Sequence, residues 1–188
     1  MWTRQLLEDC RVRSPPELRR VVVAVDPPAS SGPLADACGI VVAALGSDGR
    51  GYVLADESVQ SLAPEQWARA VVASAERHAA DRVVAEVNNG GEMVTAVMRS
   101  VSFSLPIKAV RAAVGKVARA EPVASLYTAG RVSHVGAFPA LEDEMCGLMI
   151  GGSYAGPGRS PDRADALVWA LTELLLGPVP KKPGVQIL

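Results

Sequence analysis

Three apolar segments in the first third of the chain have the pattern of β-strands. Residues 20–26 contain the continuous apolar run "VVVAV", which is typical of a central strand covered on both faces. Residues 38–46 and 51–58 are two further apolar segments, and the four residues "SDGR" (47–50) between them have turn chemistry. Connections this short join antiparallel strands, so these segments predict an antiparallel start to a sheet.

The pattern then changes to helical spacing. Apolar side chains recur every three or four positions over residues 63–80, and Pro64 suits a first helical turn. Strand-like and helix-like segments alternate from there on. The predicted helices are 2–10, 63–80, 92–101, 115–130, 139–149 and 161–176, and the later predicted strands are 81–87, 105–110 and 131–135.

Two prolines and a serine give signals for helix ends. Ser160 is expected to cap the last helix, with Pro161 at its first position. Pro122 is expected to kink or split the helix over 115–130. The Gly-rich segment 151–160 is expected to be a loop.

This order of elements predicts an α/β fold in one domain. Three antiparallel strands come first, parallel strands joined by helices follow, and helices flank the resulting mixed sheet. We expect the domain to span residues 1–176 and residues 177–188 to form a flexible tail. A length of 188 residues, of which 49% are hydrophobic, is enough for one sizeable core.

Composition excludes several classes of protein. The net charge of the chain is −1, whereas many nucleic-acid binders carry a large positive net charge. The three cysteines are far apart and form no CxxC pair, which favours reduced thiols in a cytoplasmic protein over a zinc site. No signal peptide and no apolar run of about 18 residues is present, so no membrane segment is expected. The phosphate-loop motif GxxxxGK[ST] is also absent, and we expect no ATP hydrolysis.

Acidic residues end two of the predicted strands. Asp26 follows "VVVAV" and Glu86 ends "VVAE", and sites in open α/β sheets form at the carboxyl ends of strands. The last helix adds Asp162 and Asp165, which share one face at spacing i, i+3. Each acid alone also fits a turn or cap role. Together they indicate a site for Mg²⁺ or Mn²⁺, because these cations prefer oxygen ligands and two of them promote phosphodiester cleavage.

Four segments of the chain resemble a known family. "VVVAVDPPAS…ADACGIVV", "VVAEVNNGGEMV", "KAVRAAVGKVARAEPVASLYTAGRVSHVG" and "SPDRADALVWAL" are similar, in this order, to the C-terminal nuclease domain of the large terminase subunit. That subunit is the DNA-packaging motor of tailed bacteriophages and of phage-like gene transfer agents. The resemblance covers roughly residues 2–176. It implies an RNase H-like fold and a metal-dependent endonuclease that cuts concatemeric double-stranded DNA with little sequence specificity.

The resemblance also assigns residues to this site. Asp26, Glu86, Asp162 and Asp165 match the family's catalytic and metal-binding acids, and two Mg²⁺ or Mn²⁺ ions are implied. Asp165 is the firmer of the last two, because the position of Asp162 varies between acid and histidine across the superfamily. Asp36, in "ADACG", matches a recurrent acid and is a further candidate ligand.

A basic segment supplies candidate DNA contacts. Residues 99–131 hold six basic side chains and one acid, a local balance of +5. A solvated surface would explain this composition equally well. With the resemblance, Lys116 and Arg119 become the expected contacts to the DNA backbone, with Arg131 as a weaker candidate. Asn88 and His134 are further candidates for DNA contact, although a turn and a plain strand position also explain them.

The resemblance also implies binding partners, and two alternative functions stay open. It implies double-stranded DNA as substrate and, as partners, the terminase ATPase domain, the small terminase subunit and the portal. The ATPase domain has no counterpart in this sequence, so we expect an excised domain or a stand-alone piece. A RuvC-like junction resolvase would use the same acids, and a non-catalytic RNase H-like docking module remains the alternative from another class.

Overall fold

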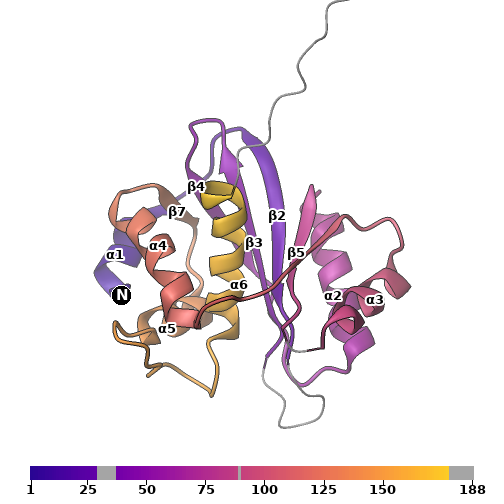
Figure 1. Ribbon diagram of the computed structural model, residues 1–188. Helices are drawn as coiled ribbons and strands as arrows, with labels where there is room; N and C mark the ends of the chain where they lie inside the picture. The colour runs from indigo at the N-terminus through magenta and orange to yellow at the C-terminus, as the bar shows by residue number, and fades with distance from the viewer. Residues whose placement is uncertain (29–36, 89, 178–188) are drawn as a thin grey trace, which may run out of the picture.

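The computed structural model describes residues 1–28, 37–88 and 90–177. In this part of the chain, seven strands form one sheet with the order β1-β7-β4-β3-β2-β5-β6, and helices cover both of its faces (Figure 1). The strands are β1 (Arg11–Val12), β2 (Leu18–Asp26), β3 (Gly39–Gly46), β4 (Gly51–Asp56), β5 (Arg82–Glu86), β6 (Ile107–Val110) and β7 (Val132–Val135). The helices are α1 (Arg4–Asp9), α2 (Pro64–Arg77), α3 (Glu92–Val101), α4 (Lys116–Thr128), α5 (Pro139–Gly147) and α6 (Asp162–Leu171), which continues as a π-helical turn, η1 (Thr172–Leu176).

The pairing of the strands confirms the predicted mixed sheet. β3 pairs antiparallel with both β2 and β4, whereas β5 is parallel to β2 and β6 is parallel to β5. β7 pairs in parallel with the outer side of β4. The short strand β1, which the sequence did not predict, pairs in parallel with β7 at the edge of the sheet. Two residues are too few to show an alternating pattern, so only tertiary pairing defines β1.

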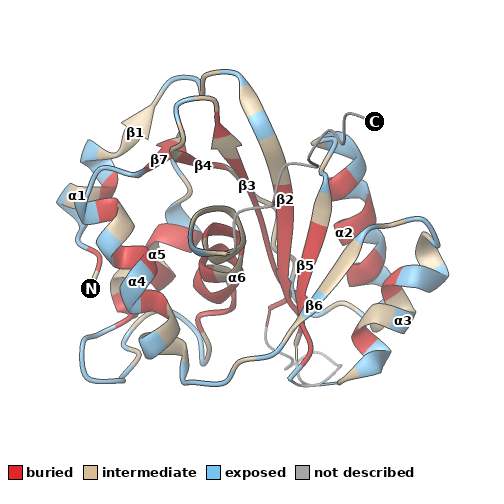
Figure 2. Cartoon of the chain, turned by 45° about the horizontal axis from the view of Figure 1, so that its top comes forward, coloured by how far each residue is buried: buried red, intermediate tan, exposed pale blue. Residues whose placement is uncertain are grey.

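Successive side chains of the central strands enter two different cores. On β2, Val22 and Ala24 pack in the core formed with α1, α4, α5 and α6. Val23 and Val25 pack in the other core, formed with α2 and α3. Figure 2 shows the resulting buried central strands and the buried helix α6 that lies against them. The continuous apolar run in β2 follows from this, because both faces of the strand are covered.

Two of the predictions for helices need comment. α4 runs from Lys116 to Thr128 and is not split at Pro122, so only the predicted kink stays open. Ser160 does not cap α6: Pro161 occupies the cap position, and the Ser160 hydroxyl instead accepts a hydrogen bond from Lys116 Nζ at 2.9 Å. The predicted tail lies, from residue 178 on, outside the described residues. No helix among the described residues combines the length and the apolar character that crossing a membrane requires.

Candidate metal centre

The arrangement of the sheet explains why Asp26 and Glu86 meet. β2 and β5 are parallel neighbours, and these acids are the last residues of the two strands. Side chains along a strand alternate between the two faces of the sheet, and Ala24 and Val84 belong to the core on the α6 side. Asp26 and Glu86 follow them by two positions and therefore face α6 as well.

Helix α6 brings the third acid to the same place. One carboxylate oxygen each from Asp26, Glu86 and Asp165 lies within 4.8 Å of the others. Asp165 belongs to the first turn of α6, and α6 packs across β3 and β2. This close packing depends on Gly39, which is paired with Asp26 across the sheet: a Cβ atom there would lie 2.0 Å from the carbonyl oxygen of Asp162. The predicted convergence of acids from three separate segments is thus present.

All four predicted acids are buried. The exposed fractions are 8% for Asp26, 7% for Glu86, 6% for Asp162 and 2% for Asp165. Asp162 begins α6 and lies next to the group of three rather than within it. Buried carboxylates are costly unless cations or hydrogen-bond donors compensate them.

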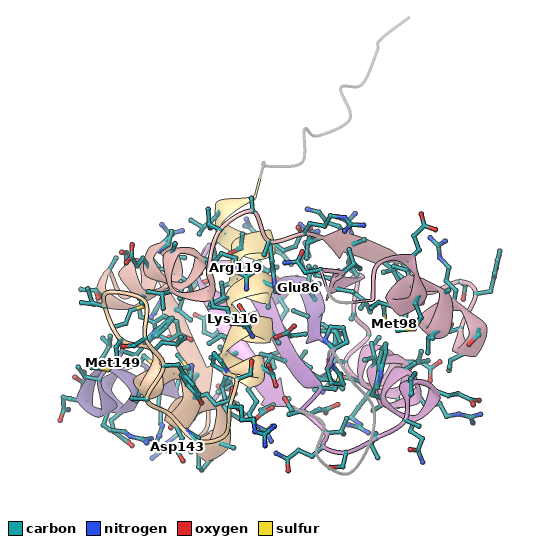
Figure 3. The ribbon with its side chains drawn as sticks, turned by 60° about the horizontal axis from the view of Figure 1, so that its bottom comes forward. Glu86, Met98, Lys116, Arg119, Asp143 and Met149 are labelled. Carbon is teal, nitrogen blue, oxygen red and sulfur yellow. The ribbon has the colours of Figure 1, made fainter. Side chains whose placement is uncertain are left out.

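Two basic residues of α4 supply part of this compensation. Lys116 Nζ lies 2.8 Å from Asp165 Oδ2, 3.3 Å from Asp26 Oδ2 and 3.5 Å from Asp162 Oδ1. Arg119 donates to Asp165 at 2.8 Å and lies 3.3 Å from Glu86 Oε2. Figure 3 shows Lys116, Arg119 and Glu86 beside α6. Two cations therefore face four acids, which leaves the cluster with a formal charge of −2.

Burial has the largest effect on the protonation of Asp26. Burial holds the pKa of Asp26 well above its ordinary value; Lys116 opposes this effect, and the neighbouring acids add to it. Burial lowers the pKa of Lys116, but Asp26 and Asp165 raise it more strongly, so its net shift is upward. The site thus favours additional positive charge.

A tryptophan completes the support of Glu86. Trp169, one turn after Asp165 on α6, donates its indole N–H to Glu86 Oε2 at 2.5 Å. The Arg119 guanidinium lies 4.8 Å from the centre of the Trp169 ring. Trp169 lies among apolar residues of the last helix, and no motif in the sequence indicates that its N–H would reach a carboxylate.

The candidate DNA contacts are not gathered on one surface. The Arg119 side chain is only 8% exposed and binds Asp165 in this structure, and its role as a DNA-backbone contact stays a prediction. His134 is fully buried between Tyr127 and Glu142, so it does not reach a DNA-binding surface in this structure. Arg131 is exposed and donates to the carbonyl oxygen of Gly49.

The two remaining candidates lie in turns or outside the described chain. Asn88 is exposed, and its Oδ1 accepts a hydrogen bond from the backbone N–H of Ala112. Asp36 lies outside the described residues. Asn88 does not belong to the cluster formed by Asp26, Glu86 and Asp165.

The donor set fits a hard divalent cation. Carboxylate oxygens from two strands and one helix converge within ion-binding distance, and no sulfur or imidazole ligand belongs to the group found among the described residues. Mg²⁺ and Mn²⁺ prefer such oxygen ligands. Asp26, Glu86 and Asp165 would hold the ion, with Asp162 next to them.

Comparison with known families agrees with this geometry. The family profile described as "Terminase RNaseH-like domain" matches residues 23–174, which include all four acids and most of the sheet. The chain belongs to this family. A sequence comparison with curated proteins gives no significant match.

Solved structures place this terminase RNase H-like domain among nuclease domains of the same fold. The large terminase of bacteriophage HK97 matches with a TM-score of 0.66 and 15% identity, over 92% of this chain and 43% of that one. The Mn-soaked, inhibitor-bound terminase nuclease domain of human cytomegalovirus matches with a TM-score of 0.63 and 12% identity, over 89% and 92% of the two chains. The large terminase nuclease of thermophilic phage G20c with bound magnesium gives 0.60 and 16%, over 87% of each chain. The chain thus spans less than half of the HK97 protein.

Proposed function

We propose that this domain is a metal-dependent endonuclease that cuts double-stranded DNA during genome packaging. The observation that carries the proposal is the buried group of Asp26, Glu86 and Asp165, which a terminase-family fold brings together at the carboxyl edge of its sheet. Such a site suits Mg²⁺ or Mn²⁺, and the related nuclease structures are described with magnesium or as soaked with manganese.

The residues of the site have different proposed roles. Divalent ions, when bound, activate water and stabilise the leaving oxygen in phosphodiester hydrolysis. Asp26, Glu86 and Asp165 hold the charge that attracts and orients these ions. Arg119 bridges Glu86 and Asp165 and so fixes the distance between them. Trp169 donates its N–H to the same oxygen of Glu86, Oε2, that Arg119 approaches, and so helps to hold this carboxylate in place.

The wider packaging role is part of the proposal. The chain corresponds to 43% of the HK97 large terminase, so the rest of a packaging motor would have to come from elsewhere. We propose the terminase ATPase domain, the small terminase subunit and the portal as partners. Alone, the domain would cut DNA with little sequence preference and without translocating it.

Plasmid digestion tests the proposed reaction directly. The purified chain is expected to nick or linearise supercoiled plasmid with Mg²⁺ or Mn²⁺ and to stop when EDTA is added. Asp26→Asn should abolish cutting, because it removes a charged ligand at nearly equal volume. Asp9→Asn, which makes the same change on the exposed end of α1, is the matched control and should cut normally. Undiminished cutting in EDTA would refute the proposal.

The two alternative functions make different predictions for the same protein. A junction resolvase of this fold would cut a four-way DNA junction much faster than a linear duplex of the same sequence. A docking module would cut neither substrate with any metal. Four buried acids, of which three lie within ion-binding distance, argue against the docking module, since buried carboxylates are costly to retain without a function.

A further inference from the structure

A cleft lies beside the acidic cluster. It has a volume of about 640 Å³, within the range of sites that bind small organic molecules. The start of α4 forms one wall, and the Gly-rich segment between α5 and α6 forms the other. The residues on which its chemistry depends are Lys116, Glu121, Leu148, Tyr154, Arg159 and Ser160.

The cleft and the acidic cluster share a wall. Lys116 lines the cleft, and its Nζ atom contacts both Ser160 Oγ at 2.9 Å and Asp165 Oδ2 at 2.8 Å. Ser160 also lines the cleft and comes two residues before the start of α6. The cleft therefore adjoins the acids that would hold a phosphodiester.

The walls of the cleft match the parts of a nucleotide. Arg159 provides a cation beside the single lining acid Glu121, whereas Lys116 shares its charge with the acidic cluster. Gly115 leaves the first amide groups of α4 without a side-chain cap. Cations and free helix amides at the start of a helix favour a phosphate group. Leu148 and Tyr154 provide apolar and aromatic surface, on which a sugar or base packs.

The glycines in the cleft keep it open. Gly151 and Gly152 have φ values of +100° and +102°, and Gly115, Gly151 and Gly152 have nothing within 4 Å of the position of an added Cβ atom. Residues with side chains would strain the backbone at Gly151 and Gly152 and narrow the cleft. The two glycines thus leave room in the cleft for a ligand.

We propose that this cleft binds the nucleotide that flanks the scissile phosphate, in the strand being cut. The inference rests on the proposed nuclease function and adds the path of the substrate strand to it. A cleft of this volume takes one nucleotide of one strand, so the domain engages the two strands of a duplex one at a time. Nicked plasmid is then the expected first product.

Amide chemical shifts test the binding directly. The probe is a four-nucleotide single DNA strand added to the full chain carrying Asp26→Asn, which does not cut under the proposed mechanism. The amide signals of Gly115, Gly151 and Gly152 should shift saturably, whereas those of Gly49 and Gly130, in turns outside the cleft, should not. Absence of any saturable shift, or saturation without movement of the cleft glycines, overturns the proposal. Equal affinity for a nucleoside monophosphate also overturns it, because it would indicate a site for free nucleotides.

Two substitutions in the wild-type chain test the role of the cleft in cutting. Arg159→Ala should weaken DNA binding about tenfold and lower the salt slope by about 0.7 for a single strand, as loss of one phosphate contact does. Its control is Arg99→Ala, which removes the same charge from exposed α3. Ala118→Trp, on the cleft side of α4, should block the cleft, whereas Ser125→Trp on exposed α4 surface should not.

The affinity for Mn²⁺, measured by calorimetry, separates the cleft from the metal site. It should be unchanged in Arg159→Ala and Ala118→Trp, because neither residue belongs to the acidic cluster. If the wild-type protein cuts plasmid but both variants bind DNA normally, the proposed role of the cleft is refuted and the nuclease proposal is unaffected. A wild-type protein that cuts nothing refutes the nuclease proposal itself.

Discussion

Gly39 is the residue on which the first turn of α6 lies. A Cβ atom at this position would come within 2.0 Å of the carbonyl oxygen and 2.5 Å of the carbonyl carbon of Asp162. Both are backbone atoms, so relief requires that α6 shift as a whole. Any such shift moves Asp165 away from Asp26 and Glu86.

Gly39→Ala is therefore expected to impair both stability and catalysis. Overpacking of this kind destabilises by about 1–3 kcal/mol, and a displacement of about 1 Å at a catalytic group costs roughly 100-fold in rate. Denaturant unfolding and plasmid cleavage measure the two effects. Gly130→Ala is the control: its positive φ of +64° makes a side chain costly for stability, but nothing lies within 4 Å of the added methyl group, so cutting should be kept. Normal cutting by Gly39→Ala would show that the position of α6 does not limit the reaction.

The two acids of α6 are expected to differ in importance. Asp165 belongs to the group of three and also binds Arg119, whereas Asp162 lies beside that group. Asp165→Ala should eliminate cleavage with either metal. Asp162→Ala should leave more activity, particularly with Mn²⁺, which accepts mixed ligands more readily than Mg²⁺.

Single-turnover cleavage in each metal distinguishes these two variants, after circular dichroism has established that both are folded. Asp162→His should also retain some activity. An inactive Asp162→Ala together with an active Asp165→Ala would reverse the two roles. It would also mean that α6 enters the site at a different angle.

The sequence predicted the acids better than the cations. A carboxylate at the end of an apolar strand is visible in the sequence, because strand ends and sheet edges follow from local patterns. Lys116 and Arg119 gave only a local excess of charge, which fits exposed phosphate contacts and a buried counter-charge equally well. Their contacts with the acids depend on how α4 packs beside α6, and no local pattern encodes that packing. Trp169 was missed for the same reason.

At the scale of elements, α6 receives its cap from another helix. Glu144 of α5 accepts hydrogen bonds through Oε2 from the backbone N–H groups of Arg163 at 2.8 Å and Ala164 at 3.1 Å. Pro161, at the cap position, offers no side-chain acceptor. Glu144 thereby holds the turn that carries Asp162.

Glu144→Ala should destabilise the protein by about 1–3 kcal/mol, because two buried N–H groups lose their acceptor. It should also weaken Mn²⁺ binding, since the first turn of α6 loosens. Glu144→Gln should behave nearly as wild type, because one amide oxygen accepts both bonds. The control is Asp143→Ala, which removes the neighbouring, partly exposed carboxylate that pairs with Arg4 on the surface. Equal losses in Glu144→Gln and Glu144→Ala would show that charge, not capping, is what matters.

The contacts of Glu142, on α5, make the stability of the fold depend on pH. Burial raises the pKa of Glu142, but hydrogen bonds from His134, Phe138 and Arg11 outweigh it and lower the pKa to about 2. A carboxyl group with a lowered pKa stabilises the fold above its ordinary pKa of 4.5, and this contribution is lost as pH falls toward about 2. Denaturant unfolding from pH 2 to 6 should show that Glu142→Gln is less stable at pH 6 and approaches wild type at pH 2. A constant difference across this range would contradict the assignment.

The order of elements was predictable because it follows from short-range patterns. Apolar runs, helical spacing and turn residues located the three antiparallel strands and the later alternation correctly. Strand β1 and the capping of α6 were not predictable, because each depends on a partner far away in the sequence: β7 for β1, and Glu144 for α6. A local signal such as "SP" at 160–161 can thus be overruled by tertiary packing.

At the scale of the whole molecule, the acidic cluster couples metal binding to folding. Four buried acids face two cations, and the unfolded chain cannot reproduce this arrangement. A ligand that binds only the folded state stabilises it by about 2.7 kcal/mol at 100 times its Kd. For a domain of this size, each kcal/mol raises Tm by about 2–4 °C.

Saturating Mn²⁺ or Mg²⁺ should therefore raise the Tm of the wild-type chain by about 5–10 °C. Asp26→Asn should be at least as stable as wild type without metal, because it removes one of the mutually repelling buried acids, and the metal should raise its Tm little. Asp9→Asn, on the surface of α1, should keep the full rise. Differential scanning calorimetry with and without EDTA measures all three. If Asp26→Asn kept the full rise, the stabilising ion would be bound elsewhere, and the acids at the carboxyl edge of the sheet would not be the metal site.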